Sequence, residues 1–98
     1  MPAYMVVQAT VTNPEQFAEY AERMPALVEK YGGKYRVLGG EVETLEGDWG
    51  HQALVISEWQ SMDQARKMWH SDEYAELKKV REGALDVTVL LADGIQGS

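Results

Sequence analysis

Residues 31–49 read Tyr-Gly-Gly-Lys-Tyr-Arg-Val-Leu-Gly-Gly-Glu-Val-Glu-Thr-Leu-Glu-Gly-Asp-Trp and hold two glycine pairs around a short alternating segment. Glycine adopts positive φ and allows close backbone approach, so each pair marks a place that other residues fit poorly. The first pair predicts the end of a helix. The second predicts a bulge or bend inside one long strand over residues 34–46. A turn at Gly47–Gly50 and a returning strand over Gln52–Trp59 would complete a long hairpin.

The segment before this hairpin predicts a strand and a helix. Tyr4–Val11 is rich in β-branched and aromatic residues and contains no breaker, which is typical of a strand. Asn13 is a suitable N-cap, with proline at the first helical position. Apolar residues then recur at helical spacing up to Tyr31. Pro25 falls inside this helix and is expected to kink it or split it in two, because proline removes an amide donor.

The segment after the hairpin predicts another helical region and a last strand. Ser61 and Gln64 form a capping-box pattern that predicts the start of a helix. Ser71 marks the start of a second helical segment. Leu85–Leu91 alternates as a strand. The order is β-α-β-β-α-β, which predicts a ferredoxin-like α+β sandwich: a four-stranded antiparallel sheet with the helices on one face. We expect residues 1–98 to form a single domain.

Composition narrows the classes of function. The net charge is −7, with 9 basic and 16 acidic residues, which argues against nucleic acid as a partner. The chain has no cysteine, so thiolate metal sites and disulfides are excluded. No apolar run approaches a membrane span, and the N-terminus lacks the features of a signal peptide. We therefore expect a cytoplasmic protein with no membrane partner.

The second face of the predicted sheet needs a cover. The row Met5, Val7, Ala9 and Val11 suits the helix side. The opposite face is too apolar for water and too polar for a dry core, and its expected members are Tyr4, Val6, Gln8, Thr10, Arg36, Leu38, Leu54, Ile56, Glu58, Thr88 and Leu90. A second copy related by two-fold symmetry would cover it. The expectation is a homodimer with a partly polar cavity between two sheets.

The predicted hairpin also places Gly39-Gly40 opposite Glu58 and Trp59, within a residue or two. The missing side chains could leave the floor of a pocket. The same glycines could instead be a bend that lets the sheet curl, with Trp59 filling the gap.

Five short motifs carry a resemblance that covers nearly the whole chain in order. They are Tyr31-Gly-Gly, Gly39-Gly-Glu-Val-Glu, Leu45-Glu-Gly-Asp-Trp49, Ser71-Asp-Glu-Tyr74 and Val80-Arg-Glu-Gly-Ala84. The pattern resembles the bacterial domain-of-unknown-function family thirteen-thirty. The resemblance implies a dimeric α+β barrel, a superfamily that includes cofactor-free monooxygenases, heme-degrading and dechlorinating enzymes and muconolactone isomerase. It transfers no catalytic residue. Many members have Arg just before the second glycine pair, where this chain has Leu38, and Arg36 lies two positions away.

Candidate catalytic residues are an acid and two histidines. Glu58 on a half-buried sheet face could shuttle protons, or it could simply pair with Arg36. His51 and His70 titrate near neutral pH but sit in loops, where histidines are usually inert. His51 near Glu46 and Asp48 lacks the fixed spacing of a metal site, so no metal is expected.

Candidate ligand-binding residues include aromatic side chains that would equally suit a core, and Arg81, which would equally suit the helix dipole. The full set is Gln8, Arg36, Gly40, Trp59, Trp69, Tyr74 and Arg81. The resulting hypothesis is a small homodimeric protein that binds or transforms a partly apolar metabolite, without a cofactor, in a cavity by the sheet. The alternative is a structural or ligand-binding dimer with no catalysis.

Overall fold

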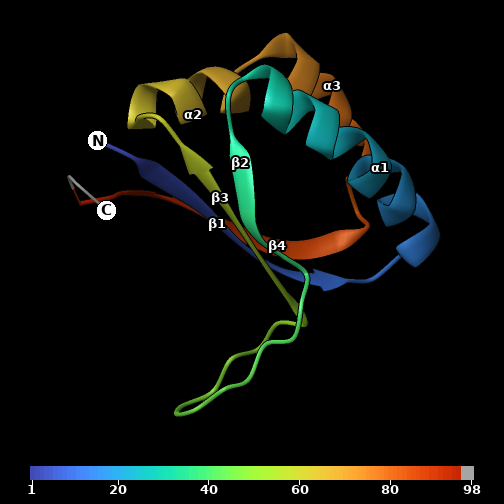
Figure 1. Ribbon diagram of the computed structural model, residues 1–98. Helices are drawn as coiled ribbons and strands as arrows, with labels where there is room; N and C mark the ends of the chain where they lie inside the picture. Colours follow the sequence, from blue (N-terminus) through green and yellow to red (C-terminus); the bar gives the residue numbers. More distant parts are fainter. Residues whose placement is uncertain (96–98) are drawn as a thin grey trace.

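The computed structural model describes residues 1–95 and arranges them as a sheet with helices on one side (Figure 1). The elements in chain order are β1 (Ala3–Val11), α1 (Pro14–Lys30), β2 (Lys34–Leu38), β3 (Ala53–Trp59), α2 (Met62–Trp69), α3 (Asp72–Val80) and β4 (Leu85–Asp93). The four strands lie in the order β2-β3-β1-β4, and all neighbours are antiparallel. The predicted ferredoxin-like α+β fold is confirmed.

Side-chain caps set the starts of α1, α2 and α3. The Asn13 side chain accepts from the Gln16 amide at 3.2 Å, and Ser61 and Ser71 do the same for α2 and α3. Each cap satisfies an amide that the helix itself leaves without a partner. Pro25 does not split α1, which is continuous over 17 residues. Leu27 and Val28, just beyond it, are buried in the core, and that burial offsets the lost hydrogen bond.

The expected long strand over residues 34–46 is wrong. β2 ends at Leu38, and residues 39–52 leave the sheet as an arm that projects away from the helices (Figure 1). The Gly39 amide still donates to the Leu54 carbonyl at 3.1 Å, with Gly39 at φ 67°. Beyond it, apolar and acidic residues alternate with no facing strand or core to select one side, and Leu45 is 88% exposed. Alternation alone therefore did not make a strand here.

The expected register of the hairpin is also wrong. Leu38 pairs with Val55, and Glu58 pairs with Lys34, so the second glycine pair lies beside Leu54 and Val55. The prediction counted outward from the turn at Gly47. That count fails because the residues of the arm do not form a paired ladder.

A bulge in β2 lies at Arg36, earlier than the glycines. The register shifts between Tyr35, which pairs with Ser57, and Val37, which pairs with Ile56. One extra residue in a strand moves the following side chains to the other face. Val37 therefore shares the uncovered face with Ile56, and Leu38 faces the helices. The expected place of Leu38 on the uncovered face is wrong for this reason.

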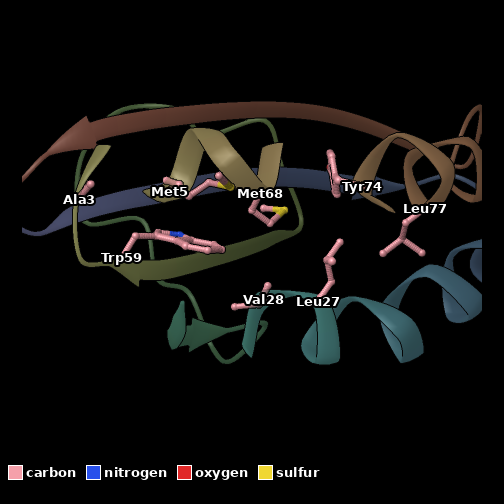
Figure 2. Packing of buried hydrophobic residues seen from close by; sticks show 9 residues of the cluster. Ala3, Met5, Leu27, Val28, Trp59, Met68, Tyr74 and Leu77 are labelled. Carbon is pink, nitrogen blue, oxygen red and sulfur yellow. The ribbon is translucent and has the colours of Figure 1, made fainter. Parts of the chain in front are cut away.

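The core lies between the sheet and the helix layer, where Trp59 and Met68 are the largest fully buried side chains (Figure 2). The Trp59 indole N–H donates to the Ser57 hydroxyl at 2.9 Å. A Cβ on Gly33 would lie 2.8–2.9 Å from three carbons of the Trp59 ring. The glycine that makes room for Trp59 thus belongs to the first pair, whereas the space around Gly40 is open.

Candidate functional site

A cavity of about 280 Å³ lies between α1 and the helix-facing side of the sheet. α1 packs chiefly against α3 and stands off the sheet, which leaves this space open. Small and β-branched residues of the strands form the floor of the cavity, such as Val7, Ala9, Val55 and Val87. Phe17 and other apolar residues of α1 form the roof. The cavity is therefore on the opposite side of the sheet from the one that the sequence predicted.

Three polar side chains meet at one end of this cavity: Tyr20 from α1, Tyr74 from α3 and Arg81, which caps α3. The two hydroxyl oxygens are 3.2 Å apart. Nη2 of Arg81 donates to the Tyr74 hydroxyl at 3.3 Å. The guanidinium carbon lies 5.5 Å from the centroid of the Tyr20 ring, within the range of a cation–π contact.

The local sequence of α3 positions this cluster. Ser71 caps the helix by accepting from the Tyr74 amide at 3.0 Å, which fixes Tyr74 in the first turn. Arg81 follows seven residues later, two turns along the same face. The Tyr74 ring also packs against Trp69 of α2, with centroids 4.9 Å apart and the ring planes tilted by 34°. The break between α2 and α3 thus directs both aromatic side chains and Arg81 to one place.

Burial governs the electrostatics of the cavity. It raises the pKa of the Tyr20 hydroxyl well above its ordinary range; Tyr74 adds to this rise and Arg81 opposes it. Burial, with a smaller effect of Tyr74, raises the pKa of Tyr35 on the cavity wall to about 12. Raised tyrosine pKa values keep these hydroxyls neutral, so they remain hydrogen-bond donors at any physiological pH.

Arg81 is 8% exposed, yet it takes part in none of the ion pairs found within residues 1–95. Those pairs are Lys30–Glu73, Arg36–Glu58, Arg66–Asp63 and Lys79–Glu76. A buried guanidinium ordinarily has a carboxylate partner. Here its described partners are the side chains of two tyrosines, Tyr74 and Tyr20.

Three of the residues predicted to bind a ligand, Trp69, Tyr74 and Arg81, come together on the cavity wall. Their role in binding stays a prediction. Sequence reasoning missed Tyr20, Tyr35 and Ser57, which also line the cavity. Tyr20 carried a usable signal, because it lies on the apolar face of α1 and must direct a hydroxyl into the interior.

The other candidates lie outside the cavity. Gln8 and Glu58 are on the uncovered face, where Glu58 pairs with Arg36 at 3.0 Å. This is the non-catalytic arrangement that the sequence allowed for Glu58. Trp59 is a core residue and Gly40 lies in the arm.

The histidines are also remote. His51, at the base of the arm, has Nδ1 3.3 Å from the Thr10 hydroxyl, and its ring is 6.2 Å from that of Trp49. His70 is exposed at the C-cap of α2. Within the described chain, no group of three or more histidine, cysteine or acidic residues is placed to hold a metal ion.

A second recess of similar volume lies on the outer surface of α3. It is lined by Ala75, Lys78, Lys79, Arg81 and Glu82. We place the candidate site in the helix–sheet cavity, because enclosed apolar surface is what binds small molecules. Arg81 borders both the helix–sheet cavity and this outer recess, so an experiment on Arg81 must show which of the two the ligand occupies.

The sheet order and the helix layer define a ferredoxin-like α+β fold. The sequence model of a domain of unknown function, DUF1330, matches residues 2–95, and the chain belongs to this family. No curated protein matches it. Among residues 1–95, no helix is long and apolar enough to cross a membrane.

Solved structures share the fold at low sequence identity. A protein of unknown function from Rhodopseudomonas palustris is 23% identical, with a TM-score of 0.74 over 97% of this chain and 83% of that one. A hypothetical protein from Arabidopsis thaliana is 19% identical, with a TM-score of 0.68 over 99% and 91%. SnoaB, a cofactor-independent oxygenase from Streptomyces nogalater, is 16% identical, with a TM-score of 0.62 over 97% and 94%.

Proposed function

We propose that this protein is a homodimer that binds a small, largely apolar molecule in the helix–sheet cavity of each protomer and transforms it without a bound cofactor. The observation that carries the proposal is the cavity itself: about 280 Å³, walled by apolar side chains, with a few polar groups gathered at one end. Small-molecule sites have this character. That SnoaB, named as a cofactor-independent oxygenase, has the same fold supports the absence of a cofactor by analogy only.

The uncovered face of the sheet supports the dimer. Val37, Ile56, Val6 and Leu90 lie side by side in one apolar row that crosses all four strands. The helices of the described chain all lie on the other side of the sheet (Figure 1). A row of this kind across an exposed sheet is costly in water, and a second copy can bury it through two-fold symmetry.

One observation favours binding without catalysis as a second candidate function. Every cavity-lining residue that the structure describes is apolar, a tyrosine, a serine, a tryptophan or Arg81, and none is Asp, Glu or His. A reaction that begins with proton abstraction needs a base of suitable pKa within reach of the substrate. Because the described lining offers no such base, catalysis here would need a substrate whose own pKa is low enough for it to ionise without one.

A cavity-filling variant tests the proposal. Ala21 lines the cavity from an exposed position on α1, so Ala21→Trp fills the space without disturbing the core. Ala18→Trp, also exposed on α1 but away from the cavity, is the matched control. A neutral bicyclic probe, 1-naphthamide, should raise the melting temperature of the wild type and of Ala18→Trp, because a ligand stabilises the state that it binds. Ala21→Trp should abolish the rise.

If 1-naphthamide does not stabilise the wild type, or stabilises Ala21→Trp equally, this cavity is not the site. Catalysis is tested separately. A ligand of the cavity is incubated with the protein in air, recovered and analysed by mass spectrometry. Conversion to a product supports an enzyme, and recovery of the unchanged ligand supports a binding protein.

A further inference from the structure

We infer that the cavity selects molecules with an acidic oxygen on an apolar body, and that this oxygen binds at the end formed by Arg81, Tyr20 and Tyr74. The inference rests on the proposed function and names the class of its ligand. The shared chemistry is an anionic oxygen, either a carboxylate or an ionised phenol or enol.

The charge of Arg81 favours an anion at this end of the cavity. An arginine is protonated at every pH at which proteins are stable. This one is 8% exposed, and the ion pairs found within residues 1–95 do not include it. Its described partners, the Tyr74 hydroxyl and the Tyr20 ring, carry no negative charge when the phenols are neutral. Desolvating a cation without an anion is unfavourable, so an anion entering the cavity is attracted to this end.

The two tyrosine hydroxyls have one proton more than their mutual contact uses. Tyr20 and Tyr74 together have two O–H protons, and the contact of 3.2 Å between their oxygens uses one. Arg81 donates to Tyr74, so that oxygen already accepts one hydrogen bond. Whichever tyrosine donates to the other, one hydroxyl proton has no described acceptor. The cluster is thus rich in donors, and an oxygen with full lone pairs complements it.

No other described group in the cavity competes with an anionic ligand for Arg81. Its lining contains no carboxylate, and Arg81 is its one formal charge among residues 1–95. Glu82 is adjacent in sequence but borders the outer recess of α3. The remaining walls are apolar, so they suit the body of a ligand whose charge lies at one end. The pattern resembles the donor sites that stabilise oxyanions in enzymes.

A matched pair of probes tests the inference. 1-Naphthoate is an anion and 1-naphthamide is its neutral counterpart of nearly the same shape. Titration calorimetry at low salt should show that the wild type binds the anion on the order of ten to a hundred times more tightly, as expected for charge-assisted hydrogen bonds. Arg81→Met should remove this preference, because it should weaken 1-naphthoate far more than 1-naphthamide, whose carbonyl oxygen carries no charge.

A milder variant guards against misfolding of Arg81→Met. Tyr74→Phe keeps the ring against Trp69 and removes one hydroxyl, so it should weaken 1-naphthoate by roughly three- to tenfold and 1-naphthamide by less. Ala21→Trp should abolish binding of both probes. Binding of 1-naphthoate that survives Ala21→Trp would place the anion in the outer recess of α3 and overturn the inference.

Failure of the inference can be told apart from failure of the proposed function. Equal affinity for both probes, both lost in Ala21→Trp, overturns the acidic-oxygen selectivity and leaves the cavity as a binding site. If neither 1-naphthoate nor 1-naphthamide binds, both the inference and the proposed function are overturned. Absorbance titration of 1-naphthol separates the two sources of anionic oxygen: a lower pKa of the bound naphthol supports phenolate recognition, whereas an unchanged pKa with preference for 1-naphthoate supports carboxylates.

Discussion

Gly33 lies directly against the indole of Trp59, and a Cβ at Gly33 would come within 2.8–2.9 Å of three ring carbons. Trp59 is 1% exposed and cannot move aside without disturbing the core between β3 and the helices. The contact joins the end of α1 to the end of β3. It leaves no room for a side chain at Gly33.

Gly33→Ala should therefore destabilise the protein by about 1–3 kcal/mol, the usual cost of forcing extra volume into a packed core. Gly40→Ala is the matched control and should be nearly neutral, because nothing lies within 4 Å of the position of its Cβ and its φ is not positive. Urea unfolding at fixed protein concentration measures both. Equal loss of stability in the two variants would contradict the packing described for Trp59.

The sequence predicted those parts of the fold that depend on local chemistry. Asn13, Ser61 and Ser71 cap helices through contacts with residues three positions away, so their roles can be seen in the sequence itself. The strands β1 and β4 have strong alternation and were predicted within two residues at each end. The Glu41–Glu46 segment alternates less regularly, since Val42 and Leu45 are three positions apart, and it has no strand partner within residues 1–95. Pairing is a property of the whole sheet.

The site was harder to predict, because its geometry depends on distant contacts. Trp69, Tyr74 and Arg81 were selected as separate candidates on neighbouring helices, and their convergence follows from the break between α2 and α3. Tyr20 joins them only because α1 packs on α3. The bulge at Arg36, which turns Leu38 toward the helices, has no local signal in a sequence whose glycines suggest a bend elsewhere.

The proposed dimer has a direct test at the centre of the uncovered face. Ile56 pairs with Val6 on one side and Val37 on the other, so Ile56→Asp would put a charge in the middle of the apolar row. Burying an unpaired carboxylate is costly, and we expect this variant to be a folded monomer. Leu45→Asp, at an 88% exposed position of the arm, is the control and should remain dimeric. Light scattering measures the mass of each variant. A monomeric mass for the wild type at micromolar concentration would refute the interface.

Tyr35 should make stability depend on alkaline pH. Its pKa is raised to about 12 by burial, so the folded protein holds this proton more tightly than the unfolded chain does. The resulting stabilisation is complete below the ordinary tyrosine pKa of about 10 and is lost as the pH rises toward 12. The stability of Tyr35→Phe relative to wild type should therefore be constant from pH 7 to about 9 and increase above about 10. A constant difference up to pH 12 would show that Tyr35 is not desolvated.

The central claim is that a ligand binds between α1 and the sheet, and methyl NMR tests it most directly because the two faces of the sheet carry different methyl groups. Val7, Val55, Val87 and Val89 line the cavity, whereas Val6, Ile56 and Leu90 belong to the opposite face. Addition of 1-naphthoate should shift the first set and give nuclear Overhauser contacts to it, with the second set unchanged. Contacts to Val6, Ile56 and Leu90 in place of the cavity methyls would contradict the account.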